Sequence, residues 1–397
     1  MIANHKRKMS EIIPFNRPYF TGKEQDYINK TYLNGQISGD GPFTKSCHEW
    51  LQTHLCCNKV LLTHSCTAAL EMAAILLDLA PGDEVIMPSY TFISTANSFV
   101  LRKAVPVFID IREDTLNINE ELIEEAITPK TKAILVVHYA GVSCEMDKIM
   151  NIAKKYNLFV VEDAAQGILS KYKDKFLGTI GHLGCLSFHE TKNITSGEGG
   201  ALIINDQKFI PRAEIIREKG SDRSQFFRGE VDKYTWRDIG SSFLPGELVS
   251  SFLLAQLQES KSITEKRIKI WNIYHAAFKK LANKGVFSLP KIPQNCSHNG
   301  HIFFLLFKNL ELRENFIIRM RESGILCIFH YIPLHLSEAG KKYAKVFGTM
   351  RISENASNQI VRLPLWIELD NEKQQRVINS ALEILEDLTT GKRIFKA

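Results

Sequence analysis

The sequence has no long hydrophobic run. No apolar stretch approaches the roughly 18–20 residues that a membrane-spanning helix needs, and the polar N-terminus lacks the apolar core of a secretory signal. The eight cysteines are scattered over 397 residues without a C-x-x-C pair, which is typical of reduced thiols. We therefore expect a cytoplasmic protein. Met9 is an alternative start, which would make residues 1–8 a dispensable leader.

Strong charge of one sign is also missing. The chain has 50 Lys+Arg against 44 Asp+Glu, and its basic clusters, His5–Lys8 and Lys392-Arg393, lie at the termini, where solvated tails are expected. This pattern does not indicate nucleic-acid binding. With 44% hydrophobic and 24% charged residues the composition is that of an ordinary globular protein, and the length predicts two domains.

The motifs of several common enzyme classes are incomplete. The glycines of 178–184 have the wrong spacing for a dinucleotide-binding fingerprint, and Gly391-Lys392 is followed by Arg393 instead of the Ser or Thr of a P-loop. His189-Glu190 begins like a zinc-protease helix, but position 193 is Asn. The sequence thus speaks against nicotinamide redox chemistry, P-loop phosphate chemistry and zinc hydrolysis, and no metal is expected.

Short apolar runs alternate with helical patterns between about residues 60 and 204. The runs lack the polar alternation of half-exposed strands, so both faces are expected to be covered. The expected strands are Val85–Met87, Val105–Ile109, Ala133–Val137, Leu158–Val161, Leu186–His189 and Gly200–Ile204. The expected helices are Thr67–Leu77, Ser94–Leu101, Asn119–Ala126 and Met146–Lys155. This alternation predicts an α/β fold with a mainly parallel sheet flanked by helices.

The pattern changes beyond about residue 242. A long helix is expected over Pro245–Leu281, followed by the proline-containing connection Leu289–Pro293. A helix at Arg313–Ser323 and a strand at Leu326–Phe329 complete a smaller α+β domain. We therefore predict a large domain over residues 1–260, N-terminal segment included, and a small domain over residues 261–397.

Three polar features have a common explanation. Asp163 ends a buried strand, at the edge where ligands bind in parallel sheets. Cys66-Thr67 opens a helix whose free N–H groups suit a phosphate, and Lys192 precedes the glycine cluster Gly197–Gly200. Pyridoxal phosphate needs such a lysine for its aldehyde, a carboxylate for its ring nitrogen and an anion site. Taken singly, these features are more typical of a helix cap, a surface lysine and a tight hairpin.

The motifs resemble the DegT/StrS family of sugar aminotransferases, which are pyridoxal phosphate enzymes of fold type I (aspartate aminotransferase-like). The resemblance covers Ile13 to the C-terminus and is carried by Ser38–Thr44, Pro81–Phe92, Glu162–Gln166, Ser187–Lys192, Gly197–Gly200 and His330–His335. It implies a homodimer with sites at the interface, a nucleotide-sugar substrate and L-glutamate as amino donor.

The resemblance also implies residue roles. Lys192 would link to the cofactor and move the proton, while Cys66, Thr67, Phe92, Asp163, Gln166 and Ser187 would bind the cofactor, and His330, Tyr331 and His335 the substrate. Phe92 either stacks on the ring or packs in the core. His189 either lines the site or is structural, and residues 330–335 either contact the sugar nucleotide or form a domain hinge.

Two segments leave questions open. Many relatives place a partner-subunit Asn on the phosphate where this chain has Ser242, and the arginine that follows in them is absent. The arginines of Arg217–Arg237 either bind the diphosphate or the donor carboxylates, or belong to a solvated loop.

The resemblance extends to a substrate. The run Thr235–Ser242 is similar to members that convert dTDP-4-keto-6-deoxy-D-glucose and L-glutamate to dTDP-4-amino-4,6-dideoxy-D-galactose and 2-oxoglutarate, for enterobacterial common antigen or a related surface polysaccharide. The alternatives are a nucleotide-sugar aminotransferase of other position or stereochemistry, a pyridoxal phosphate sugar dehydratase, and a non-catalytic binding protein. Dehydratases of this family replace the lysine by His, so Lys192 disfavours that alternative.

Overall fold

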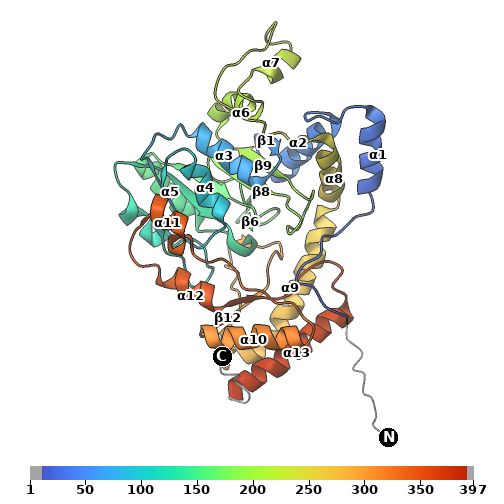
Figure 1. Ribbon diagram of the computed structural model, residues 1–397, viewed down its shortest axis with the longest axis vertical. Coiled ribbons are helices and arrows are strands. Elements are labelled where there is room, and N and C mark those ends of the chain that lie inside the picture. The colour runs from blue at the N-terminus through green and yellow to red at the C-terminus, as the bar shows by residue number, and fades with distance from the viewer. Residues whose placement is uncertain (1–10, 391–397) are drawn as a thin grey trace.

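The computed structural model describes residues 11–390 (Figure 1). The terminal basic clusters and Met9 therefore lie outside the described residues. The upper part of Figure 1 is built around a large sheet, and the lower part around the C-terminal helices α10 (Leu310–Glu322) and α13 (Asn371–Thr390). Helix α9 (Ser260–Ala282) runs between the two parts.

The large sheet has eight strands in the order β1-β9-β8-β5-β4-β2-β3-β13. The strands are β1 (Lys59–Thr63), β2 (Glu84–Pro88), β3 (Val105–Ile109), β4 (Thr131–Val137), β5 (Phe159–Asp163), β8 (Leu183–Ser187), β9 (Gly200–Ile204) and β13 (Lys345–Val346). Pairing is parallel from β13 to β8, and β9 pairs antiparallel with both of its neighbours, β8 and β1. The prediction of a mainly parallel sheet is confirmed.

Both faces of this sheet are covered by apolar side chains. On β4, Ile134 and Val136 belong to one hydrophobic cluster, while Ala133 and Leu135 belong to the other. Since no face meets water, the strands read as continuous apolar runs without polar alternation. The covering helices are α2 (Pro42–Leu55), α3 (Cys66–Leu76), α4 (Ile93–Val100), α5 (Met146–Tyr156), α6 (Ile210–Arg217) and α8 (Glu247–Gln258).

Three predicted elements were wrong in kind or extent. The expected helix Asn119–Ala126 is two short 3-10 turns, Glu120–Leu122 and Glu124–Ala126. The expected continuous helix over 245–281 is broken at Glu259 into α8 and α9. The expected strand Leu326–Phe329 is extended chain that makes only one bridge, from Ile328 to Arg362.

The C-terminal part has its own small sheet and core. The sheet has the order β10-β12-β14, with strands β10 (Phe287–Ser288), β12 (Phe304–Phe307) and β14 (Ile360–Arg362). In α9, Ile263 packs with the large sheet, whereas Ile270 and Trp271 pack in the C-terminal core. Ile13 also packs in the C-terminal core, although the prediction placed it in the large domain. The division at residues 260 and 261 stays a prediction.

The remaining elements frame these two parts. The helices are α1 (Glu24–Asn34), α7 (Arg223–Phe227), α11 (Glu338–Tyr343) and α12 (Arg351–Gln359), and the strands are β6 (Lys171–Tyr172), β7 (Lys175–Phe176) and β11 (Cys296–Ser297). Helix α7 stands away from the body at the top of Figure 1. Within residues 11–390, no helix is long and apolar enough to cross a membrane.

Candidate active site

A cavity of about 930 Å³ is lined by both parts of the molecule. The large sheet contributes Asp163 at the end of β5 and Ser187 at the end of β8, and the C-terminal part contributes the segment 328–332 and Arg362. The sequence-predicted residues that line it are Cys66, Thr67, Phe92, Asp163, Gln166, Ser187, Lys192, His330 and Tyr331. The structure thus brings together every predicted site residue except His335.

The start of α3 forms one wall of the cavity. Ser65 caps this helix, because its side chain accepts a hydrogen bond from the Ala68 N–H at 3.1 Å. The N–H groups of Cys66 and Thr67 belong to the first turn, where no intrahelical acceptor exists. Gly200 of β9 lies directly behind this turn, since a Cβ there would come within 2.4 Å of the backbone of Ser65 and Cys66. The sequence therefore needs glycine at position 200 to hold this anion site.

Asp163 presents a buried carboxylate to the cavity. The residue is 5% exposed, and its oxygens accept hydrogen bonds from Thr95 Oγ1 at 2.8 Å and from the Ala165 N–H at 3.1 Å. Burial raises the pKa of Asp163, and the two hydrogen bonds and the nearby charge of Lys192 oppose that rise. A carboxylate in this setting suits a cationic partner, and a protonated ring nitrogen is one.

Lys192 lies in the connection between β8 and β9. A turn fixes its backbone, with the Lys192 N–H donating to the His189 carbonyl at 2.9 Å. Burial lowers the pKa of Lys192, and the neighbouring Cys66 and Asp163 act in the opposite direction. Burial thus favours the neutral amine, which is the form that attacks an aldehyde. The lysine, the carboxylate and the helix start together fit pyridoxal phosphate.

Gln166, Tyr331 and His330 form a second, hydrogen-bonded wall. Gln166 accepts a hydrogen bond from the Ala140 N–H at 2.7 Å and donates one to the Tyr331 hydroxyl at 2.9 Å. The Tyr331 ring stacks on His330 with 3.7 Å between centroids, and His330 Nδ1 contacts the Tyr139 hydroxyl at 2.6 Å. These contacts leave the side chains little freedom, as a binding wall requires.

The structure places both Phe92 and His189 at the cavity. Phe92 is 57% exposed and lines the cavity, so it is not a core residue. His189 also lines the cavity, where its Nδ1 contacts Thr191 Oγ1 at 2.9 Å.

His335, unlike the other predicted residues, does not line the cavity of its own chain. Its Nδ1 is 2.7 Å from Ser89 Oγ, and its Nε2 is 3.2 Å from a carboxylate oxygen of Glu354. Both ring nitrogens are thus engaged in joining the segment after Pro333 to β2 and α12. A role for His335 in binding the substrate stays a prediction.

The arginines of the 217–237 segment are already neutralised. Each is within ion-pair distance of a carboxylate, in the pairs Arg217–Asp40, Arg223–Glu218, Arg228–Glu214 and Arg237–Asp222, at 2.8, 3.1, 2.9 and 2.5 Å. None of the four lines the cavity of its own chain. Ser242 is exposed and bridges Glu218, also away from the cavity.

Several cavity residues were missed from the sequence, and three of them carry basic side chains. These three are Arg267, His301 and Arg362. A signal existed for Arg267, because it occupies the apolar face of α9 between Ile263 and Ile270. His301 and Arg362 reach the cavity through the tertiary fold of the C-terminal part, and no local pattern marks them.

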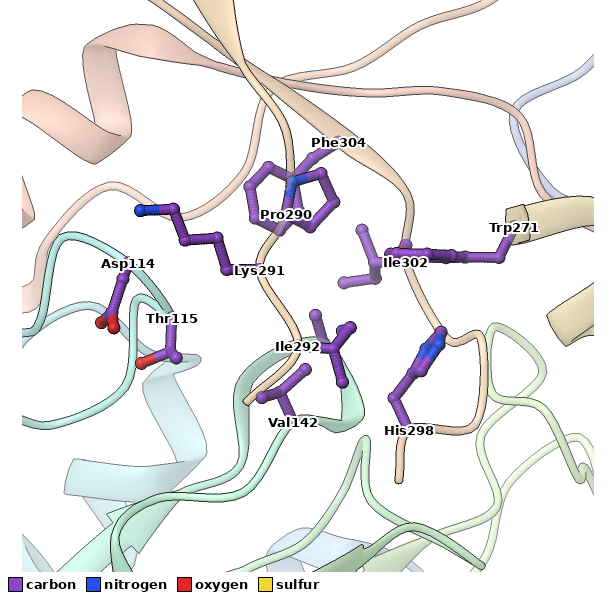
Figure 2. Close-up of a pocket in the computed structure, with 11 residues that line it drawn as sticks. Asp114, Thr115, Val142, Trp271, Pro290, Lys291, Ile292, His298, Ile302 and Phe304 are labelled. Carbon is purple, nitrogen blue, oxygen red and sulfur yellow. The ribbon is translucent and has the colours of Figure 1, made fainter. Parts of the chain in front are cut away.

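A second, much smaller cavity lies between the large sheet and the C-terminal part (Figure 2). Its walls include Trp271, His298, Ile302 and Phe304. The volume of about 10 Å³ gives room for about one water molecule. It is too small for any substrate or cofactor.

Comparison with known proteins agrees with this site. The profile of the DegT/DnrJ/EryC1/StrS aminotransferase family matches residues 18–382. The spore coat polysaccharide biosynthesis protein SpsC of Bacillus subtilis is 30% identical over 96% of this chain and 99% of its own length. GDP-perosamine synthase of Escherichia coli O157:H7 is 30% identical over 94% of this chain and 99% of its own length.

Solved structures show the same fold. The putative sugar aminotransferase Spr1654 of Streptococcus pneumoniae, in its PLP form, superposes with a TM-score of 0.86 at 26% identity. The superposition covers 95% of this chain and 99% of that chain. The same protein is also known in its PMP form.

Proposed function

Because this chain belongs to the DegT/DnrJ/EryC1/StrS aminotransferase family, and is thereby a pyridoxal phosphate-dependent sugar aminotransferase, we propose a specific reaction for it. The amino group of L-glutamate is transferred to carbon 4 of dTDP-4-keto-6-deoxy-D-glucose, which gives dTDP-4-amino-4,6-dideoxy-D-galactose and 2-oxoglutarate. The observation that carries the proposal is the convergence of Lys192, Asp163 and the start of α3 on one cavity.

Each side chain has a defined part in this proposal. Bound pyridoxal phosphate supplies an electron sink for the electrons released when a proton leaves the substrate carbon. Lys192 Nζ would hold the cofactor through its aldehyde and, as a free amine, would carry the proton. The Asp163 carboxylate favours the protonated ring nitrogen by its opposite charge. The N–H groups of Cys66 and Thr67, with the Ser187 hydroxyl, hold the phosphate.

The remaining predicted residues position ring and sugar. Phe92 is exposed in the cavity, as an aromatic ring that stacks on the cofactor must be. The Gln166 amide contacts the ring hydroxyl in the proposal. His330 and Tyr331 contact the sugar in the proposal. His335 is left out of the proposal because it does not line the cavity.

The choice of substrate rests on resemblance. The run Thr235–Ser242 is similar to the enterobacterial dTDP-4-amino-4,6-dideoxygalactose transaminase (WecE). Relatives named for spore coat polysaccharide and for GDP-perosamine support the wider class of nucleotide-sugar amination for polysaccharide synthesis. GDP-perosamine synthase is also the reason to test a GDP-linked 4-keto sugar as the second candidate.

We also propose a homodimer that works in the cytoplasm, in the synthesis of enterobacterial common antigen or a related surface polysaccharide. All eight cysteines are free, as expected in a reducing compartment.

The test is a product analysis. The enzyme is incubated with L-glutamate and dTDP-4-keto-6-deoxy-D-glucose, and the product is identified by mass and NMR, with Lys192→Ala as control. An axial amine at carbon 4 is expected. An equatorial amine, amination at carbon 3 or a preference for the GDP sugar would discard the proposed product and keep the enzyme class. Absence of amination of any keto-sugar nucleotide would discard the substrate class.

A further inference from the structure

The short turn that follows β4 makes two hydrogen bonds to the second wall of the cavity. The turn is the 3-10 helix Tyr139–Gly141, and its first two residues are buried. The Tyr139 hydroxyl reaches His330, and the Ala140 N–H reaches Gln166. Neither Tyr139 nor Ala140 lines the cavity, so any effect of this turn on a bound substrate passes through the wall residues.

The contact between Tyr139 and His330 has one favourable direction. Tyr139 is 1% exposed, and its hydroxyl lies 2.6 Å from His330 Nδ1. Among residues 11–390 no other atom is within hydrogen-bond distance of that hydroxyl. A buried hydroxyl whose proton stays unpaired costs about 1–3 kcal/mol, so Tyr139 donates and His330 Nδ1 accepts. The single proton of a neutral imidazole is then on Nε2.

His330 is held in its neutral form. The residue is 8% exposed, and burial lowers its pKa, an effect to which the nearby Arg362, His301 and Lys192 add. Its Nε2 has no hydrogen-bond partner in the described part of the chain and stays accessible. Since His330 lines the cavity, a free Nε2–H is available to whatever binds there.

The neighbouring Tyr331 has the same polarity. Gln166 Oε1 accepts from the Ala140 N–H at 2.7 Å, and a backbone N–H can only donate, so the Gln166 amide offers its Nε2–H to the Tyr331 hydroxyl at 2.9 Å. That hydroxyl accepts a hydrogen bond, and its own proton has no acceptor within residues 11–390. The Tyr331 ring stacks on His330 at 3.7 Å, which holds the two donor groups together.

We propose that Tyr139 is a positioning residue, which holds His330 in its Nε2–H form so that His330 and Tyr331 both present donors to the ketone oxygen of the sugar. The proposal rests on the proposed function, which places a keto sugar against these two residues. A ketone oxygen only accepts hydrogen bonds, whereas the ammonium group of an amino sugar only donates them. A wall of fixed donors therefore suits the keto substrate and disfavours its aminated product. A neutral imidazole N–H can also polarise a carbonyl group.

The competing interpretation is that Tyr139 only fills the core. Its ring belongs to the same buried cluster as Tyr90, with 5.5 Å between the two ring centroids. Tyr90 is also 1% exposed, and its hydroxyl has no hydrogen-bond partner in the described residues. Tyr90→Phe thus removes a hydroxyl from the same cluster without removing a hydrogen bond, and it is the matched control for Tyr139→Phe.

The first measurement determines the tautomer. Nitrogen NMR of the cofactor-loaded enzyme with isotope-labelled histidine distinguishes a bare ring nitrogen from one that carries a proton. The signal of His330 is identified by its absence from His330→Gln, or from His330→Asn where the first variant does not fold. Wild type and Tyr90→Phe should carry the His330 proton on Nε2 alone. Tyr139→Phe should show both tautomers, because nothing then holds the proton on one nitrogen.

The second measurement separates the sugar from the amino donor. Tyr139→Phe should raise the KM for dTDP-4-keto-6-deoxy-D-glucose by about three- to tenfold, as expected for one neutral hydrogen bond. The half-reaction with L-glutamate, followed by the absorbance of the cofactor, should be unchanged, since the donor does not need this hydrogen bond. Tyr90→Phe should change neither quantity.

Three results would overturn the assignment. They are a His330 proton on Nδ1 in wild type, equal effects of Tyr139→Phe and Tyr90→Phe, and a loss in the L-glutamate half-reaction as large as the loss for the sugar. The wild-type spectrum alone decides the tautomer where Tyr139→Phe does not fold. Failure of the proposed function is separate, because wild type would then show the Nε2–H form of His330 and aminate no keto-sugar nucleotide.

Discussion

Lys192 is placed where burial favours the neutral amine. Its pKa lies below the ordinary value of 10.5, so the neutral fraction grows at lower pH than for a lysine in water. We predict that the apoprotein captures pyridoxal phosphate at a rate that rises with pH and levels off before 10.5, as followed by absorbance from about pH 6 to about pH 10.

A free lysine derivative in the same buffers is the control for that measurement. Its rate should still be rising where that of the protein has levelled. If the protein and the free amine show the same pH dependence, the amine that captures the cofactor is not a buried one, and Lys192 is excluded.

Asp163 acts through its charge, and we predict a large effect from removing that charge alone. Asp163→Asn keeps the size of the side chain but loses the opposite charge beside the ring nitrogen. It should remain folded, bind the cofactor more weakly and lose about a hundredfold in turnover, since such a charge shifts a pKa by about 1–3 units.

Thr95→Val is the matched variant for Asp163. It removes the hydrogen bond to Asp163 Oδ2 and leaves the charge in place, so its effect should be about tenfold or less. Near wild-type turnover by Asp163→Asn would contradict the role of this carboxylate.

At this scale the sequence revealed the residues that belong to local motifs. Asp163, Ser187 and Lys192 stand at strand ends or in a glycine-flanked loop, and parallel strands bring such positions to one edge. Arg362 and His301 have no such local context. Arg267 lies among the buried apolar residues on one face of α9, so its sequence pattern is that of a core helix. His335 lies outside the cavity although its neighbours in the sequence, His330 and Tyr331, line it.

The contact between β9 and the start of α3 is the element-scale feature that shapes the anion site. A Cβ at Gly200 would meet the backbone of Ser65 and Cys66 at 2.4 Å, and backbone cannot swing aside. We predict that Gly200→Ala lowers the free energy of unfolding by about 3 kcal/mol or more and weakens cofactor binding. Denaturant unfolding of the apoprotein and cofactor titration measure the two effects.

Gly197→Ala provides the comparison in the same loop. No atom lies within 4 Å of a Cβ at Gly197, and its φ of +79° is the only obstacle, which costs about 1–2 kcal/mol. Equal stability and equal cofactor affinity of the two variants would show that the close approach at Gly200 does not shape the site.

Elements buried on both faces were the most predictable. The runs at β2 to β5 are continuous because the helices cover both sides, and their order along the chain implied a parallel sheet. No proline or glycine marks the break between α8 and α9 in the sequence. The break follows from tertiary packing, because α8 packs with the large sheet whereas most of α9 packs in the C-terminal core. The segment 326–329 is apolar like a strand, but its position leaves it a single bridging partner.

The whole molecule exposes an apolar patch that we define as Tyr32, Leu33, Ile37 and Leu248. Tyr32 and Leu33 are 78% and 79% exposed, and the Glu247 N–H bonds to the Ile37 carbonyl, which joins α8 to this face. Because such patches mark interaction surfaces, we predict a homodimer that buries it. Light scattering should give twice the mass of the chain.

Leu33→Asp combined with Ile37→Asp should shift this dimer towards monomer. Ile318→Asp, on the exposed face of α10 and 47% exposed at that position, should leave it intact. A wild-type monomer with full turnover would contradict the prediction. So would a dimer that persists when Leu33→Asp and Ile37→Asp are combined.

The central claim is that the cavity around Lys192 is the aminotransferase site, and one measurement tests it most directly. The cofactor-loaded enzyme is reduced with borohydride, digested, and mapped by peptide mass. We predict that the cofactor is retained on the peptide containing Lys192, and that prior addition of L-glutamate prevents the retention because it releases the lysine. Retention on any other lysine, or none in an enzyme that binds the cofactor, would contradict the account.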